Sequence, residues 1–121
     1  MKMSGLKYTV KETLERHLRE RQDELLAVSD ATKDDRKPVV LDQAAIGRLS
    51  RMDAMQQQAM AIETERRREV ELQRIEAALK RIKIDDYGYC VSCDEKISAR
   101  RLKADPAEPL CIDCAEGLGR P

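Results

Sequence analysis

Residues 90–114 read CVSCDEKISARRLKADPAEPLCIDC and contain all four cysteines of the 121-residue chain. The spacing is C-x2-C-x17-C-x2-C. A two-residue gap lets both thiolates of a pair face one ion, and a spacer of roughly 15 to 20 residues brings the second pair round to complete a tetrahedron. The pattern therefore predicts one structural zinc ion bound by Cys90, Cys93, Cys111 and Cys114. Four protein ligands leave no open position for water, so a catalytic zinc is not expected.

Two other uses of such cysteines are a redox dithiol and an iron–sulfur cluster. A redox dithiol usually needs a single C-x2-C pair, whereas a cluster would use the same four ligands and stays open as an alternative. A metal also explains how this part of the chain folds. A segment of about 35 residues with few large apolar side chains buries too little surface to fold unaided, and metal binding supplies the missing stability.

Upstream of the cysteines, the sequence predicts a helix at about residues 5–31. Its apolar residues recur at intervals of three or four, as on one face of a coiled-coil helix. Four successive charged residues, then Lys37 and Pro38, predict a loop at residues 32–42, because proline disfavours helix at the residue before it. The apolar stripe of this first helix consists of Leu14, Leu18, Leu25 and Val28, with Arg21 as the polar exception.

A second, longer helix is predicted at about residues 43–84, which contain no proline and no glycine after Gly47. Its last half carries the clearer apolar seam, and its middle is polar. The fold class is therefore mainly α, with a long antiparallel two-helix coiled-coil hairpin at residues 1–84. A small C4 zinc-finger module with a short C-terminal helix follows at residues 85–121. The apolar seam of the second helix consists of Leu72, Ile75, Leu79 and Ile82.

The charge balance argues against a DNA-binding zinc finger. The chain has 23 Lys plus Arg and 23 Asp plus Glu, so no excess of cations is available to release counterions from a nucleic acid. Residues 85–121 hold eight acidic and five basic residues, a net charge of −3. Direct sequence-specific DNA binding is not expected from an acidic finger.

The residue content also disfavours an enzyme or a membrane protein. No nucleophile–base constellation or glycine-rich phosphate loop is visible, and the only histidine, His17, lies beside the first helical stripe. No stretch approaches the roughly 20 apolar residues that span a membrane, and no signal peptide is visible. We expect a cytoplasmic protein whose thiols stay reduced.

Outside the cysteines, a longer string of residues resembles the DksA/TraR family of bacterial transcription factors. The string begins with Tyr87-Gly88-Tyr89 before the first cysteine and includes Ile97, Arg101-Leu102-x-Ala104-x-Pro106 and Leu110-Cys111-Ile112-Asp113-Cys114. This resemblance implies binding to bacterial RNA polymerase, with the hairpin inserted into the secondary channel. Its tip would approach the catalytic centre and destabilise initiation complexes, often together with the alarmone guanosine tetraphosphate. A zinc-stabilised protein–protein adapter without polymerase binding is the alternative.

The resemblance also implies roles for residues at the hairpin tip. Asp42 and Ala44 match the second of two family aspartates and the alanine after it, so both are implied to contact the polymerase. Val39 stands at the position of the first aspartate. Asp42 also lies where the second helix needs its N-cap, so capping is a further role for this carboxylate.

The alarmone is possible as a ligand but doubtful. Asp105 and Ala115 stand where the family has basic residues that help to hold it. Arg67 and Arg74 still match basic positions on the second helix, and Arg101 is a further candidate for contact with the polymerase rim. We therefore expect a weak response to guanosine tetraphosphate, or none.

Overall fold

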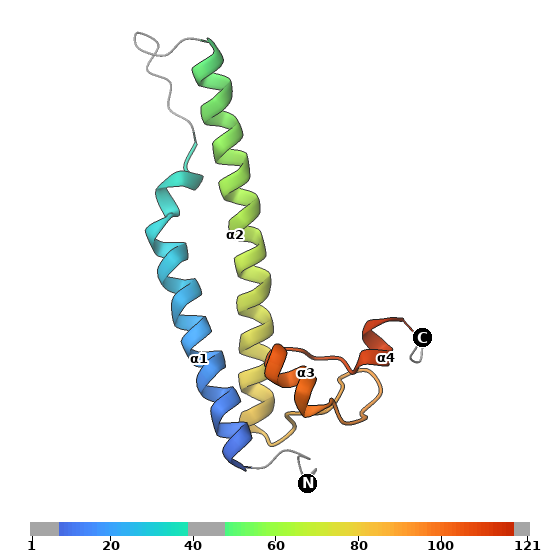
Figure 1. Ribbon diagram of the computed structural model, residues 1–121. Coiled ribbons are helices and arrows are strands. Elements are labelled where there is room, and N and C mark those ends of the chain that lie inside the picture. The colour runs from blue at the N-terminus through green and yellow to red at the C-terminus, as the bar shows by residue number, and fades with distance from the viewer. Residues whose placement is uncertain (1–7, 39–47, 118–121) are drawn as a thin grey trace. The chain divides into compact units, whose positions relative to one another are not determined.

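The computed structural model describes residues 8–38 and 48–117 of the chain (Figure 1). The described part is mainly helical, as predicted, and contains no β-strand, only an isolated bridge between Tyr89 and Lys96. None of its helices is long and apolar enough to cross a membrane. The helices are α1 (Tyr8–Ala31), the 3-10 helix η1 (Lys33–Arg36), α2 (Arg48–Lys83), α3 (Ala99–Ala104) and α4 (Ile112–Ala115).

The chain divides into two compact units. Unit 1 comprises residues 1–23 and 72–121, and unit 2 comprises residues 24–71. The first part of α1 and the last part of α2 therefore fold together with the cysteine-containing segment. The remaining halves of both long helices form the second unit.

The core of unit 1 is apolar and draws on both long helices and on the cysteine-containing segment. Leu14 and Leu18 of α1 and Ile75 of α2, all from the predicted stripes, are at most 2% exposed. Unit 1 thus has one shared hydrophobic core, and burial of these apolar side chains stabilises it. Its other buried residues are Ala78, Tyr87, Cys90, Ile97, Leu102 and Ala107.

Helix α2 ends in a tight turn that leads into the zinc-finger segment. The backbone N–H of Asp85 donates to the carbonyl of Ile82 (3.2 Å), and that of Asp86 donates to Arg81 (2.8 Å). This pair of bonds is the Schellman pattern, which requires a left-handed residue, and Asp85 fills that position with φ = +58°. The Nζ of Lys11, on α1, lies 2.9 Å from Oδ1 of Asp85 and fixes its side chain.

Unit 2 has a polar seam. The largest buried side chain of α2 in this unit is Glu65, 8% exposed, at coiled-coil spacing from the half-buried Ala61 and Arg68. Glu65 accepts a hydrogen bond from the hydroxyl of Ser29 (2.5 Å) and lies 3.3 Å from Arg36 and 2.9 Å from Arg68. A buried carboxylate is tolerated here because each of its oxygens has a polar partner.

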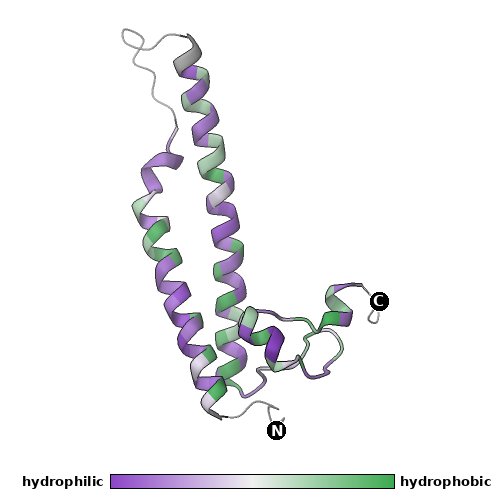
Figure 2. Cartoon of the chain, in the orientation of Figure 1, coloured by the Kyte–Doolittle hydropathy of each residue, from purple (hydrophilic) through white to green (hydrophobic). Residues whose placement is uncertain are grey.

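One residue of the predicted α1 stripe does not lie in the seam. Val28 is 43% exposed, whereas Leu25 is buried. After Leu25 the face directed at α2 continues at Ser29, four residues on, because Ser29 meets Glu65. Large apolar side chains of unit 2 therefore lie on its outside, scattered among hydrophilic residues (Figure 2). Those exposed are Leu26, Val28, Met52, Met55, Met60, Ile62 and Val70.

The segment predicted as a loop at residues 32–42 starts with a helical turn, η1. The Thr32 hydroxyl donates to the carbonyl of Val28 (2.8 Å), and Arg36 donates to the Thr32 hydroxyl (3.1 Å) and the Ser29 carbonyl (3.1 Å). These bonds satisfy the last turn of α1, so the charged residues prolong a helical conformation instead of ending it. Residues 39–47, which include the predicted N-cap Asp42, lie outside the described residues.

We expect the stability of unit 2 to fall in acid because of Glu65. The Ser29 hydroxyl, followed by Arg68 and Arg36, holds the pKa of this carboxyl below its ordinary value of 4.5. A lowered folded-state pKa gives stability that is present above the unfolded pKa and is lost as pH falls through the folded pKa. Hydrogen exchange of peptides from residues 24–71 should therefore show weaker protection at pH 3.5 than at pH 7.

Glu65→Gln should remove most of this pH dependence and cost about 1.5–3 kcal/mol at pH 7, the range for hydrogen bonds to charged groups. Glu69→Gln, at an exposed position of the same helix, is the matched control. It should change neither the pH dependence of protection nor the stability of unit 2 at pH 7. Equal pH dependence in the two variants would contradict the assignment to Glu65.

Candidate metal centre

The first cysteine pair lies in a tight backbone turn. The N–H of Cys90 donates to the carbonyl of Glu95 (2.8 Å), and that of Asp94 donates to the carbonyl of Cys90 (2.9 Å). Asp94 adopts the left-handed conformation, φ = +66°, which Asp tolerates better than most residues. The turn therefore forms with Asp at the position after the second cysteine.

The second cysteine pair lies at the start of a short helix. Cys111 is the N-cap of α4, and its carbonyl accepts from the N–H of Ala115 (2.9 Å). Its partner Cys114 is one turn along the helix. The two pairs are joined by the N–H of Val91, which donates to the carbonyl of Pro109 (2.9 Å).

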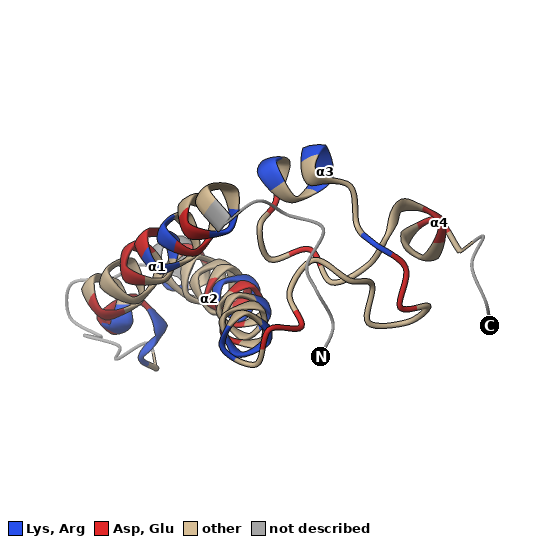
Figure 3. Ribbon diagram, turned by 90° about the horizontal axis from the view of Figure 1, so that it is seen from below, with Lys and Arg blue, Asp and Glu red and all other residues tan. Residues whose placement is uncertain are grey.

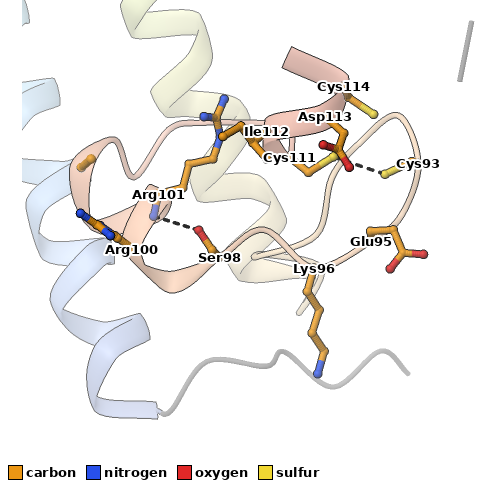
Figure 4. Close-up of a pocket in the computed structure, with 11 residues that line it drawn as sticks. Cys93, Glu95, Lys96, Ser98, Arg100, Arg101, Cys111, Ile112, Asp113 and Cys114 are labelled. Carbon is orange, nitrogen blue, oxygen red and sulfur yellow. Dashed lines mark hydrogen bonds between the residues drawn. The ribbon is translucent and has the colours of Figure 1, made fainter. Parts of the chain in front are cut away.

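The four cysteine sulfur atoms form one cluster, all within 4.8 Å of one another. The sulfur atoms of Cys93 and Cys111 lie 3.6 Å apart (Figure 4). Tetrahedral zinc–thiolate bonds of about 2.3 Å place sulfur atoms about 3.8 Å apart. The four sulfurs therefore fit one zinc ion with no other ligand, as expected of a structural site.

The backbone and the neighbouring thiols affect the four cysteines unequally. Burial raises the pKa of the Cys90 thiol, but backbone hydrogen bonds from Cys111, Cys93 and Ser92 outweigh it and lower the pKa to about 6. Burial and then the other thiols raise the pKa of Cys114 to about 12. Four thiolates this close repel one another, so a divalent cation must displace protons to bind them, and its affinity falls as pH falls.

The aromatic side chain before the first cysteine pair is buried and hydrogen-bonded to the spacer between the two pairs. Tyr87 is 1% exposed, and its hydroxyl donates to the carbonyl of Pro106 (2.7 Å). Burial raises the pKa of this phenol above its ordinary value, so it remains a donor. The N–H of Ile97 donates to the carbonyl of Gly88 (2.8 Å), which closes the first turn.

Two of the three arginines predicted at the polymerase rim are held by acidic residues of unit 1. Nη2 of Arg74 lies 3.0 Å from Asp105 and 3.4 Å from Glu108. Nη2 of Arg101 lies 3.4 Å from Glu108. Arg67, in unit 2, is 77% exposed, and its Nε lies 3.5 Å from Oε1 of Glu63 on the same helix. The tip residues Asp42 and Ala44 lie outside the described residues.

Sequence reasoning missed Glu108. It stands between two prolines of the spacer and has no signature of a functional residue, so only its contacts reveal its position.

Basic residues lie on α3, and an acidic residue lies on α4 (Figure 3). An open pocket of about 1080 Å³ lies beside the sulfurs of Cys93, Cys111 and Cys114, with Arg100 and Arg101 on its lining (Figure 4).

Comparison with known proteins identifies the family. The model of the prokaryotic dksA/traR C4-type zinc finger matches residues 85–118. A solved structure of the DnaK suppressor protein from Agrobacterium tumefaciens C58 is 30% identical over 95% of this chain and 98% of that one, with a TM-score of 0.54. The chain belongs to the DksA/TraR family. The transcription factor DksA2 from Pseudomonas aeruginosa, 24% identical with a TM-score of 0.72 over 92% of this chain and 84% of that one, has the same fold.

The curated relatives match the finger and its surroundings. The chain is 54% identical over 43 residues to the RNA polymerase-binding transcription factor DksA of Haemophilus influenzae, and 49% identical over 43 residues to that of Escherichia coli K12. These matches cover 36% of this chain and 30% and 28% of the relatives. The matched segment thus spans less than a third of the relatives' length. The family's C4 finger and the clustered sulfurs identify one structural zinc.

Removal of zinc should unfold the cysteine-containing part of unit 1. Besides Cys90, its buried side chains are Tyr87, Ile97, Leu102 and Ala107, a core too small to fold unaided. Metal binding contributes on the order of 10 kcal/mol to the folding of such modules at neutral pH. In ¹H–¹⁵N spectra of the full chain, a chelator should collapse the dispersed signals of residues 87–117. Signals of unit 2 should persist.

Cys93→Ser should produce the same spectrum without a chelator, whereas Val91→Ala, at a neighbouring residue that is 61% exposed, should leave zinc content at one per chain. Retention of dispersed signals from residues 87–117 after complete zinc removal would contradict a structural role for the metal.

Proposed function

We propose that this protein binds bacterial RNA polymerase and regulates transcription initiation. The observation that carries the proposal is the 54% identity of the finger region to a protein named an RNA polymerase-binding transcription factor. The two-helix architecture beside that finger, similar to the fold of DksA2, supports it. The protein acts as a binding protein and not as an enzyme, in the bacterial cytoplasm where the polymerase works.

The hairpin is the part that enters the polymerase in this proposal. Two helices side by side are about 20 Å across, which suits a channel that passes nucleotides. Unit 2 presents a surface rich in charged side chains, and its seam is polar as well, so it suits a water-filled pore. Asp42 and Ala44, at the tip, are proposed to act near the catalytic centre, with one carboxylate where better-known members have two.

Among the predicted rim residues, Arg67 is the best placed for an external partner. Its side chain is 77% exposed and its contact with Glu63 is an exposed i,i+4 pair, which contributes little to stability. Arg74 and Arg101 are instead engaged with Asp105 and Glu108. A polymerase contact by either of these two arginines would have to compete with the carboxylates already beside it.

Binding to purified bacterial RNA polymerase tests the proposal directly. The zinc-loaded protein should bind core enzyme saturably and be displaced by a known secondary-channel factor. Asp42→Asn should retain binding but weaken the effect on open promoter complexes at least several-fold, because the tip carboxylate acts after the hairpin has docked. Asp53→Asn, an exposed aspartate of α2, is the matched control and should retain full activity.

Absence of binding at tens of micromolar, with zinc content and helicity confirmed, would refute the polymerase proposal and favour the adapter. A mobility shift of promoter DNA by the protein alone, falling steeply with salt, would point to DNA binding instead.

We infer that guanosine tetraphosphate has little effect through the family's site at the finger. Asp105 replaces a basic residue there, and its carboxylate lies 3.0 Å from Arg74, so it both repels an anion and engages a neighbouring cation. Adding the alarmone should change the protein's effect on open-complex lifetime by less than about twofold, on a polymerase that lacks any other alarmone site. A family member with both basic residues is the positive control, and an equal response from the two proteins would overturn the inference.

A further inference from the structure

Glu108 connects three separate parts of unit 1. Its side chain is only 17% exposed, and both carboxylate oxygens are used. Oε2 lies 3.4 Å from Nη2 of Arg74, on α2. Oε1 lies 3.4 Å from Nη2 of Arg101, on α3, and accepts the backbone N–H of Leu110 at 3.3 Å.

The contact with Leu110 is directed at the metal centre, because Leu110 immediately precedes the ligand Cys111. Both polar groups of the Leu110 backbone are engaged. Its N–H donates to Glu108, and its carbonyl accepts from Nε of Arg101 at 2.9 Å. Arg101 thus holds the approach to Cys111 directly and also through Glu108.

The other end of the network is attached to α2. Arg74 bridges Glu108 and Asp105, at 3.4 Å and 3.0 Å. Asp105 in turn orders the spacer, because its Oδ1 accepts the N–H of Ala107 (3.2 Å) and its own N–H donates to the carbonyl of Arg101 (3.0 Å). A continuous chain of charge-assisted contacts therefore runs from α2 to the residue before Cys111.

We propose that Glu108 is a positioning residue for the zinc site, and that Arg74 and Arg101 act with it. It holds the second cysteine pair in place relative to α2 and α3, so the rate of zinc loss is set partly by residues that do not touch the metal. Groups that orient metal ligands from outside the coordination shell typically change metal affinity about 10- to 100-fold. This role does not depend on which macromolecule the protein binds.

Release of zinc from the full-length, zinc-loaded protein to a chromophoric chelator, 4-(2-pyridylazo)resorcinol, measures this role. Glu108→Gln should release zinc about 10-fold faster or more, because the amide loses the charge that holds both arginines. Glu116→Gln makes the same charge change at an exposed position of the same module and should leave the rate unchanged. The cobalt(II) form of Glu108→Gln should keep the absorption of a tetrahedral four-sulfur site, which shows that the ligands themselves are intact.

Arg74→Gln tests whether α2 takes part, with Arg66→Gln, at an exposed arginine of the same helix, as its control. We expect release accelerated at least threefold in Arg74→Gln, with unchanged helicity. If the two residues act through the same contacts, their effects are not additive. The Arg74→Gln/Glu108→Gln double variant should then release zinc about as fast as the faster single variant.

Release from Glu108→Gln at the rate of the unsubstituted protein would overturn the proposal. Acceleration in Glu108→Gln but none in Arg74→Gln would overturn the link to α2. Loss of the tetrahedral cobalt spectrum in Glu108→Gln would also overturn it, because the side chain would then be needed to form the site and not to position it.

Discussion

The binding of one cation by four sulfur atoms governs the C-terminal part of this protein. Thiolates within 4.8 Å of one another repel strongly, and besides Cys90 the segment that carries them buries Tyr87, Ile97, Leu102 and Ala107. A divalent ion offsets the repulsion and adds stability that so small a core does not provide. The chain forms a scaffold around that ion, which consists of the buried Tyr87, the turn at Asp94 and the N-cap of α4 at Cys111.

The two units are stabilised in different ways along the same pair of helices. In unit 1, leucine and isoleucine side chains and the zinc-finger segment form a dry core. In unit 2, the corresponding seam holds Glu65 with Ser29, Arg36 and Arg68. Replacing apolar burial with a satisfied polar cluster gives less net stabilisation, since desolvation of the charges offsets much of their attraction. The pairing of α1 with α2 in unit 2 therefore depends more on pH than their apolar pairing in unit 1.

Much of this arrangement follows from the sequence. The cysteine spacing predicted the sulfur cluster, because two C-x2-C pairs with this spacer have few other uses. The apolar stripes predicted the helices and the buried Leu14, Leu18 and Ile75, because burial of large aliphatic side chains dominates packing. The sequence wrongly predicted Val28 on the face of α1 directed at α2, a position that Ser29 occupies. Hydrophobic periodicity gives no signal for a serine that bonds to a buried glutamate.

The charged residues show where such reasoning ends. Arg67, Arg74 and Arg101 look alike in the sequence, yet Arg67 is exposed and the other two are engaged with acids. Arg74 meets Asp105, 31 residues away in the chain, and Arg101 meets Glu108 in the segment that follows α3. Long-range ion pairs depend on the tertiary fold and leave no periodic signal, so neither Asp105 as the partner of Arg74 nor the central position of Glu108 could be predicted. The tip residues Asp42 and Ala44 remain predictions.

The pairing of Lys11 with Asp85 has a consequence for the order of folding. Each helix can begin from contacts within a few residues, but this contact joins positions 74 residues apart and so requires closure of a long loop. The left-handed turn at the end of α2 obtains its side-chain partner only after α1 has returned to its side. The direction in which the chain enters the zinc-finger segment is therefore completed late, by a residue from the N-terminal part of the chain.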